Sequence, residues 1–263
     1  MSPVSTRLNY LAASERKPRY YLSQAEDGEP ARPATESIAV EVADARAEAA
    51  LSLEREGIEL LRHRSKVTDF YNATEVRRIY FAEVEALVRE HLGAYRVHVF
   101  DYNVRNSSRA GEKGVSSPVK FVHHDYTETS GPQRVRALLG EEAPPLLEGR
   151  FAVVNVWRPI RGPIEENPLG VCDAQSMAPS DFVSTDLVYP DRTGEVYSVK
   201  FSHNHRWLYF PRMRAEEVML LKCYDSAVDG RARFTAHSAF RDPTSPPNPA
   251  PRESIEIRTL AFY

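Results

Sequence analysis

After Gly93 the chain becomes a succession of short β-type runs, and this pattern restricts the fold more than any other feature of the sequence. Turn and loop residues separate the runs, and residues 95–102 (YRVHVFDY) alternate as a half-buried strand does. The runs cover residues 95–102, 117–123, 151–157, 182–188, 196–201, 207–210, 218–224, 233–237 and 254–262. So many short strands in one stretch predict an antiparallel jelly roll, the double-stranded β-helix, in which side chains from distant strands converge on the interior.

The residues before this core predict flanking helices and irregular segments. Residues 1–40 contain interspersed proline and charge, so we expect them to be largely irregular. We expect short strands at residues 19–22, 37–42 and 58–61 and a helix at residues 43–55, which are rich in Ala, Glu, Leu and Arg. This part of the chain is therefore expected to support the core.

The clearest helix is expected at residues 73–91, where apolar residues recur at steps of three and four. Asn72 is the expected N-cap, Glu75 stands at the capping-box position, and Gly93 is expected to end the helix. One apolar face predicts that this helix packs against the outside of a sheet.

Length and composition predict a single mainly β domain with flanking helices. The chain has 263 residues, 42% hydrophobic and 27% charged, which is ample for one sizeable core and short for two. We expect one domain over residues 1–263, with a helical and irregular support region at 1–93 and a jelly-roll core with the functional site at 94–263. The net charge of −3 indicates neither a nucleic-acid nor an anionic-membrane partner.

The cysteines and the hydropathy pattern predict a cytoplasmic protein. Cys172 and Cys223 are too far apart for a metal-binding pair and too few for a disulfide framework. The first residues contain no apolar segment typical of a secretory signal, and no stretch approaches the length of a membrane span.

Two neighbouring residues offer the first two ligands of a metal site. If the chain is extended there, His123 and Asp125 lie on one face, because strand side chains repeat every two residues, and His124 faces the other way. A His-x-Asp triplet is weak evidence by itself, since it occurs by chance in many chains. A third ligand must come from a later strand.

His237 is the preferred third ligand. It ends the run RARFTAH, whereas its rivals His203 and His205 form a pair of their own. Two imidazoles and one carboxylate make up the facial triad of non-haem Fe(II) oxygenases, which leaves positions open for a co-substrate and O2. We prefer His237 because of the arginines that follow it.

The last predicted strand contains Arg252, Ser254 and Arg258 on one face at period two. A dicarboxylate co-substrate such as 2-oxoglutarate needs a deep cationic anchor, and the planar fork of arginine suits its distal carboxylate. One arginine would bind that carboxylate with the Ser254 hydroxyl, while the other pairs nearer the metal. The alternative is a structural ion pair of either arginine with Glu253 or Glu256.

These residues also carry a family resemblance that runs over residues 8–263. The segments HHDYT, NVWRPIRGPIEENPLGVCDAQSM, HRWLYFPRMRAEEVMLLKCYDS and HSAFRDP with PRESIEIR are similar to the hydroxylase/desaturase family that includes AsaB-type enzymes. The family also includes proteins related to gibberellin desaturation and cephamycin methoxylation. DAR at 44–46 and EREGIELL at 54–61 belong to the same resemblance.

The resemblance implies an Fe(II)/2-oxoglutarate-dependent oxygenase that uses Fe(II), 2-oxoglutarate and O2. Such enzymes hydroxylate, desaturate or cyclise small secondary metabolites at an unactivated C–H bond. The family's metal ligands fall on His123, Asp125 and His237, and its co-substrate pair falls on Arg252 and Ser254. The substrate and the position oxidised are not readable from the sequence.

Substrate contacts are expected from several strands and loops. We expect them from Asn155, Trp157, Tyr126, Asp173, Ser176 and Arg158, with Lys120 and Arg105 as further candidates. Asn155 and Trp157 alternate on one strand and would face the cavity together. Residues 103–117 and 127–149, the latter with a short helix at 132–139, are expected lids. Basic residues from these lids at the mouth would indicate a carboxylate on the substrate.

Two alternative functions remain at the level of the sequence. A cupin-like, non-redox metalloenzyme, an isomerase or a hydrolase, would use the same ligands but would not need Arg252 as a dicarboxylate anchor. A non-catalytic binding protein would be expected to lose a ligand. An exposed N-terminal arm would support a homodimer. His124 departs from the small or apolar residue usual in the family; we expect it to face solvent, and the alternative is a contact to the substrate or to a metal ligand.

Overall fold

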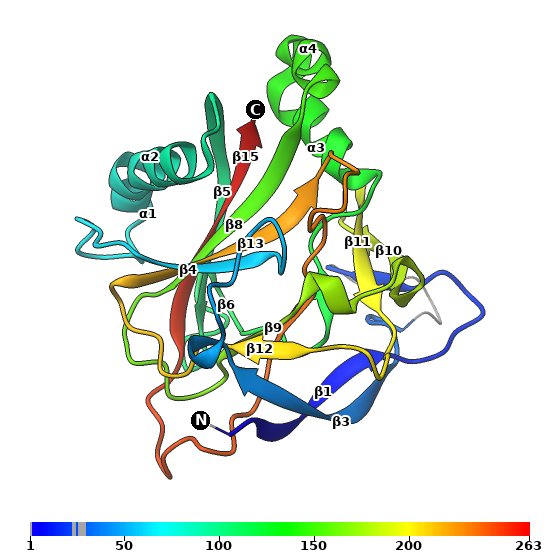
Figure 1. Cartoon of the computed structure of the whole chain (residues 1–263), viewed down its shortest axis with the longest axis vertical. Coiled ribbons are helices and arrows are strands. Elements are labelled where there is room, and N and C mark those ends of the chain that lie inside the picture. The colour runs from blue at the N-terminus through cyan, green and yellow to red at the C-terminus, as the bar shows by residue number, and fades with distance from the viewer. Residues whose placement is uncertain (1, 23–24, 26–29) are drawn as a thin grey trace.

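The computed structural model describes residues 2–22, 25 and 30–263, and these residues form two curled β-sheets with helices packed around them (Figure 1). The nine-stranded sheet has the order β1 (Val4–Leu11), β3 (Thr35–Asp44), β12 (Trp207–Tyr209), β9 (Leu169–Cys172), β14 (His237–Ala239), β7 (His123–His124), β11 (Thr193–Val199), β10 (Phe182–Val188) and β2 (Arg19–Tyr21). The six-stranded sheet has the order β4 (Ile58–Arg62), β13 (Glu217–Asp225), β8 (Phe151–Pro159), β15 (Glu253–Phe262), β5 (Arg96–Asn106) and β6 (Val115–Ser116).

The main core lies between the two sheets. Every residue of β8 is buried, and its side chains alternate between two cores. Val153 and Trp157 pack with Leu208 of the other sheet, whereas Val154 and Val156 pack on the outer, helix-covered face. The chain therefore folds as the predicted jelly roll, and alternate residues of its central strands reach the interior.

Helix α2 (Phe81–Leu92) covers the outer face of the six-stranded sheet, as predicted (Figure 1). Its Val84 and Val88 pack against Val154 and Ile257. Two shorter segments, α1 (Ala73–Glu75) and the π-helical η2 (Val76–Tyr80), lead into it. The helix ends at Gly93 with φ of 66°, a left-handed conformation that glycine adopts without strain.

At the start of this helix, the predicted N-cap is confirmed and the predicted capping box is wrong. The Asn72 side chain accepts hydrogen bonds from the backbone N–H groups of Thr74 at 3.0 Å and Glu75 at 3.2 Å, so it is the N-cap. The capping-box prediction for Glu75 is wrong, because its carboxylate instead accepts hydrogen bonds from the backbone N–H groups of Thr68 and Asp69. Glu75 thus fixes the chain before the helix.

The predicted helix at 43–55 is wrong; only the short 3-10 turn η1 (Ala45–Ala47) forms there. Charged side chains in this segment and just after it bind partners distant in the fold or the loop backbone. Arg46 forms a two-pronged ion pair with Glu217, at 2.8 Å for each N–O contact. Glu56 accepts from the backbone N–H of Ser52. Tertiary ion pairing therefore overrides helix propensity.

The N-terminal residues contain more strand than predicted. β1, expected to be irregular, pairs along its whole length with β3 and is the edge of the nine-stranded sheet. β9 was likewise not predicted. Residues 117–123 pair only at their end, because β7 begins at His123. The expected exposed N-terminal arm is thus part of a sheet, and the homodimer stays a prediction.

Most of the remaining strands overlap the predicted runs, and β10 has the predicted bounds. β6 was not predicted, and β14 begins only at His237, the last residue of the predicted run 233–237. Helices α3 (Ser130–Leu139) and α4 (Ala143–Glu148) follow β7, α3 close to the predicted 132–139. Single-turn helices η3 (Gly140–Glu142), η4 (Ala174–Ser176) and η5 (Pro179–Asp181) complete the described elements. Among the described helices, none combines the length and the apolarity needed to cross a membrane.

Candidate metal centre and active site

His123, Asp125 and His237 come together at the interior ends of two adjacent strands. His123 of β7 and His237 of β14 are register partners, and their ring centroids are 4.4 Å apart. His123 Nε2 lies 3.8 Å from Asp125 Oδ1. One ligand atom from each residue lies within 4.8 Å of the others. This spacing allows all three atoms to bind one metal ion.

Hydrogen bonds to the backbone set both imidazoles in the form that binds a metal. His123 Nδ1 lies 2.9 Å from the carbonyl oxygen of Phe121, and His237 Nδ1 lies 3.2 Å from that of Thr235. A carbonyl oxygen only accepts, so each Nδ1 carries the proton and donates it. Each Nε2 therefore keeps its lone pair for a metal.

The electrostatics of the centre favour neutral imidazoles and an ionised carboxylate. Burial and the neighbouring His237 ring lower the pKa of His123 to about 3. Burial acts to raise the pKa of Asp125, but the Arg258 charge and the two imidazoles hold it well below its usual value. These are the protonation states in which a 2-His-1-carboxylate set binds Fe(II).

The rival histidines lie elsewhere. His205 Nδ1 contacts the Tyr10 hydroxyl at 3.1 Å, and its Nε2 contacts Asp181 at 3.1 Å. His203 packs edge-on against Phe201. Neither belongs to the cluster of His123, Asp125 and His237, so the structure favours His237 as the third ligand.

The prediction that His124 faces solvent is wrong. It is fully buried, and its ring packs against Phe182, Tyr197 and Phe234. Strand alternation turns it away from His123 and Asp125, as expected, but aromatic side chains cover that face. Burial lowers its pKa to about 4.

Arg252 is a buried cation that lacks an ion-pair partner in the described part of the chain. Its Nη1 donates to the carbonyl oxygen of Asn167 at 2.7 Å, and its Nε donates to Ser254 Oγ at 3.2 Å. The guanidinium lies 5.1 Å from the centroid of the Trp157 ring. Burial, and next the charge of Arg105, lower the pKa of Arg252 to about 9. An anion bound here would relieve an unpaired buried charge.

Arg258 lies beside the cluster. Its Nε is 3.6 Å from Asp125 Oδ2, and its other nitrogens bind Asp101 at 3.0 Å and Glu256 at 2.9 Å. Burial acts to lower its pKa, but the carboxylates of Asp125 and Glu256 raise it well above its usual value. The alternative of a structural ion pair with Glu256 therefore holds for Arg258 and fails for Arg252.

Asn155 and Trp157 both lie on the interior face of β8, where they pair in register with Arg258 and Glu256. Asn155 Oδ1 and Trp157 Nε1 are buried, and neither atom has a hydrogen-bond partner among the described residues. Buried polar atoms without partners are rare in proteins, so these two atoms suit a bound polar molecule.

The predicted substrate contact of Arg158 is wrong. Strand alternation places Arg158 on the outer face of β8, opposite Asn155 and Trp157. Its guanidinium donates to the carbonyl oxygen of Ala215 and lies over the rings of Phe70 and Tyr80. It anchors the helical layer.

Of the other predicted substrate contacts, Tyr126 lines a cavity and Asp173 binds neighbouring protein groups. Tyr126 lines a cavity with Asp125, and burial raises its pKa to about 12. Asp173 instead accepts from the backbone of Gln175 and pairs with Arg206 at 2.9 Å.

Three further candidates have structural partners or lie at the surface. The Ser176 hydroxyl donates to the carbonyl oxygen of Asp173. Arg105 pairs with Glu256 at 3.1 Å, and Lys120 is exposed.

A cavity of about 240 Å³ opens onto Asp125 and Arg258. Its walls come from α3 and from the turn between β10 and β11, and the lining residues include Gln133, Arg134, Leu187, Tyr189 and Arg192. Sequence reasoning did not single out these residues. The spacing of polar residues along the predicted helix was the available signal for α3; the turn carried none.

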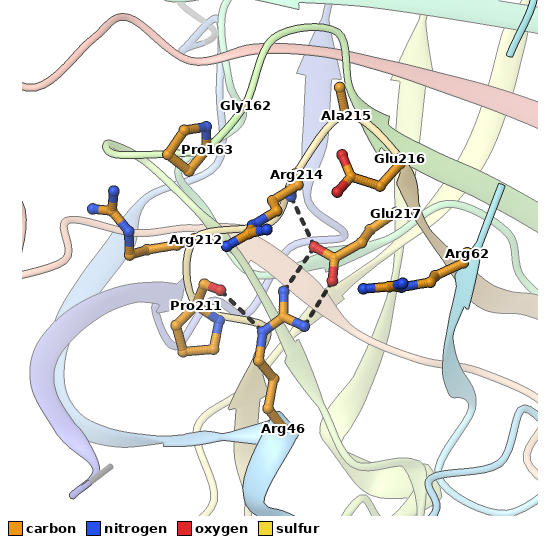
Figure 2. Close-up of a pocket in the computed structure, with 10 residues that line it drawn as sticks. All are labelled: Arg46, Arg62, Gly162, Pro163, Pro211, Arg212, Arg214, Ala215, Glu216 and Glu217. Atoms are coloured by element: carbon orange, nitrogen blue, oxygen red, sulfur yellow. Dashed lines mark hydrogen bonds and ion pairs between the residues drawn. The ribbon is translucent and has the colours of Figure 1, made fainter. Parts of the chain in front are cut away.

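A larger cavity of about 740 Å³ lies elsewhere, and none of its lining residues belongs to the metal cluster. Figure 2 shows the lining residue Arg46, which donates to Glu217 and to the carbonyl oxygen of Pro211. Arg62 and Arg214 line the same space. Size alone would favour this cavity, but only the smaller one contains a ligand of the cluster. We therefore assign the chemistry to the smaller cavity.

A jelly roll with two histidines and one carboxylate converging on its interior defines the class of non-haem iron oxygenases. Comparisons with known proteins agree. A family model described as an oxidoreductase/YMDC permease-like domain matches residues 8–262. The alpha-ketoglutarate-dependent dioxygenase phiK of a fungal species is 34% identical over 220 residues, covering 80% of this chain and 79% of phiK.

Two further relatives name the same chemistry. The Fe(II)/2-oxoglutarate-dependent dioxygenase nvfI of Aspergillus novofumigatus is 37% identical over 186 residues, covering 70% of this chain and 66% of nvfI. The hydroxylase/desaturase asaB of Aspergillus flavus is 39% identical over 195 residues, covering 65% of this chain and 85% of asaB.

The solved structure of the iron and alpha-ketoglutarate-dependent endoperoxidase NvfI superposes with a TM-score of 0.92 at 27% identity, over 99% of this chain and 98% of NvfI. The chain belongs to the hydroxylase/desaturase family and is an Fe(II)/2-oxoglutarate-dependent dioxygenase. The comparisons give no support to a cupin-like, non-redox enzyme.

Proposed function

We propose that His123, Asp125 and His237 bind the Fe(II), and that the enzyme oxidises an unactivated C–H bond of a small secondary metabolite. The single observation that carries the assignment is the cluster itself, with ligand atoms within 4.8 Å and both Nε2 lone pairs free. The iron supplies the O2 activation. The choice between hydroxylation, desaturation and cyclisation depends on where the substrate's C–H bond lies.

Arg252 and Ser254 are the proposed anchor of the distal carboxylate of 2-oxoglutarate. The support is a buried arginine without an ion-pair partner in the described residues, with the Ser254 hydroxyl at 3.2 Å. A guanidinium binds a carboxylate through two parallel N–H···O bonds. Trp157 Nε1, a buried donor without a partner among the described residues, stands next to the same guanidinium.

Arg258 and Asn155 are proposed to hold the metal end of the site. Arg258 Nε lies 3.6 Å from Asp125 Oδ2 and balances its charge, and Asp125 Oδ1, 3.8 Å from His123 Nε2, would be the oxygen that binds the iron. Asn155 Oδ1 offers an acceptor on the neighbouring strand β8, in register with Arg258. Burial of all these groups excludes water, which strengthens their electrostatic contacts.

We also propose that residues 1–263 form one oxygenase domain and that the protein is cytoplasmic. The family match over residues 8–262 supports the first proposal, and the two buried, unpaired cysteines support the second. A homodimer remains a prediction without a specific contact behind it.

The first test is succinate formation by the protein loaded anaerobically with Fe(II), then given 2-oxoglutarate and O2. Such enzymes commonly show slow uncoupled decarboxylation without the right substrate, so we expect succinate that requires iron. Wild type is compared with Asp125→Ala and with Asp181→Ala, a control carboxylate that binds His205 instead. Equal succinate from wild type and Asp125→Ala would refute the assigned ligand set.

A further inference from the structure

We propose that the substrate carries a carboxylate, which Arg134 and Arg192 bind at the mouth of the cavity above the metal ligands, with an apolar body inside. This inference rests on the proposed function, because the same cavity contains Asp125 and Arg258. It concerns recognition of the substrate and leaves the chemistry at the metal unchanged.

One wall of the cavity is a single face of α3. The lining residues of this helix are Ser130, Gln133, Arg134 and Ala137. They follow the spacing of three and four residues that puts side chains on one helix face. Arg134 is therefore directed at the cavity by the geometry of its helix, whereas Arg136 lies on a different face and is exposed.

The packing of α3 holds this face in place. Gly131 sits directly on the ring of Tyr224, where an added Cβ would come within 2.7 Å of the ring carbon Cδ2. Val135 and Leu139 of the same helix are buried in the main core. The helix cannot rotate without breaking these contacts, so Arg134 keeps its position at the cavity.

The opposite wall is the turn between β10 and β11. The lining residues from this side are Leu187, Tyr189, Arg192, Thr193, Gly194, Glu195 and Val196. The guanidinium of Arg192 lies 3.9 Å from the centroid of the Tyr189 ring, a stacking contact that restricts its side chain. In Figure 1 α3 and β11 lie next to each other, so the two walls face one cavity.

The carboxylates that line the cavity already have cationic or hydrogen-bonding partners. Glu195 binds Lys17 at 3.0 Å and accepts from the Thr127 hydroxyl at 2.6 Å. Asp125 faces Arg258 and is a proposed iron ligand. Among the described residues, the cavity lining therefore has no carboxylate left for further arginines.

Arg134 and Arg192 are the two arginines of the lining that pair with none of its carboxylates. Within the described part of the chain, neither guanidinium has a hydrogen-bond or ion-pair partner; that of Arg134 lies over the Phe100 ring at 5.7 Å and that of Arg192 over Tyr189. Two guanidinium groups without counter-charges at one mouth suit an anionic group of the ligand, and their planar forks match a carboxylate.

The rest of the lining indicates the nature of the substrate's body. Ala137, Leu187 and Val196 contribute apolar side chains to the lining of the same cavity. The volume of about 240 Å³ is below the roughly 300–1,000 Å³ typical of ligand sites. A small apolar acid with its carboxylate at the mouth fits both the charge and the size.

The test measures binding of carboxylic acids and of their uncharged methyl esters. The protein is loaded anaerobically with Fe(II) and saturating 2-oxoglutarate and titrated calorimetrically with 4-phenylbutyrate, cyclohexanecarboxylate and decanoate, each paired with its methyl ester. We expect at least one acid to bind at least about tenfold more tightly than its ester, the difference that about 1.4 kcal/mol of ion pairing gives.

Variants identify the arginines. Arg134→Gln and Arg192→Gln are each expected to weaken binding of that acid about five- to tenfold and to leave ester binding unchanged, as loss of one partly exposed charge pair predicts. Arg136→Gln, on the same helix but outside the cavity, is the matched control and should change neither.

Two results would overturn the proposal: no acid binding more tightly than its ester, or an equal loss in Arg136→Gln and Arg134→Gln. The visible absorption band of the Fe(II)–2-oxoglutarate complex separates this failure from failure of the proposed function. If that band forms and the acids do not bind, only the substrate class is wrong. If the band does not form, the metal and co-substrate assignment is wrong.

Discussion

Replacing Arg252 by methionine should change co-substrate binding and protein stability in opposite directions. Without an anion, Arg252 is a buried charge next to Arg105, and its pKa is lowered to about 9. Methionine keeps the length of the side chain and removes the charge. The metal-loaded variant without 2-oxoglutarate should therefore be at least as stable as the wild type.

The loss in co-substrate binding can be worked out from the contact it removes. A guanidinium fork supplies two charge-assisted hydrogen bonds of about 1.5–3 kcal/mol each. Taking the lower value for each gives about 3 kcal/mol, since water replaces part of the contact. At about 1.4 kcal/mol per factor of ten, the apparent requirement for 2-oxoglutarate should rise about 100-fold.

The assay is succinate formation against 2-oxoglutarate concentration at saturating Fe(II), together with thermal unfolding with and without 2-oxoglutarate. Arg252→Lys keeps the charge but loses the fork, so it should fall between wild type and Arg252→Met. Arg136→Met is the control for loss of an exposed arginine. The reasoning is refuted if Arg252→Met lowers the melting temperature and leaves the 2-oxoglutarate requirement within about threefold of wild type, well short of the 100-fold expected.

The remaining predictions concern the ligands, a helix cap, acid stability and one glycine. His237→Ala should abolish binding of Fe(II) and turnover, whereas His205→Ala should lower the melting temperature and keep iron binding, measured by metal content after gel filtration. Asn72→Ala should cost about 1 kcal/mol of unfolding free energy in urea with unchanged turnover, because two backbone donors lose their acceptor. Burial, with a neighbouring arginine, lowers the pKa of His63, so the unfolded chain takes up its proton first and stability should fall as pH drops below about 6.5. The loss of unfolding free energy between pH 7.5 and 5.5 should be smaller in His63→Asn; an equal loss would assign it to other groups. Gly57→Ala should unfold at clearly lower urea concentration, since Gly57 has φ of 80° and its new Cβ would meet a threonine hydroxyl at 2.0 Å; an unchanged midpoint would contradict this packing.

Features carried by periodicity and by ligand chemistry could be predicted from the sequence. The alternation in the later strands predicts which residues of β8 and β15 reach the interior, and thus Asn155 and Trp157 on one face. His237 could be preferred over His205 because an Arg-x-Ser follows it in the last strand. The same alternation, applied to Arg158, would have excluded it as a substrate contact.

Features set by tertiary contacts could not be predicted in this way. Arg46 lies in a segment of helix-forming composition, but it forms a two-pronged ion pair with Glu217, which is distant in the sequence. The segment therefore does not form the predicted helix. His124 is buried only because Phe234 and other rings from later segments cover it. The mouth of the cavity depends on how α3 and the β10–β11 turn meet, which no local pattern encodes.

Both proposed iron-binding imidazoles are held by carbonyl groups of their own chain, two residues back, at Phe121 and Thr235. The orientation of the two rings is thus set by backbone carbonyl groups in the segments that lead into β7 and β14. The side chains of α3 and of the β10–β11 turn make neither of these two hydrogen bonds, so substitutions among them leave both contacts in place. The walls of the cavity can therefore change in evolution, and with them the substrate, while the backbone contacts that orient the two imidazoles stay the same.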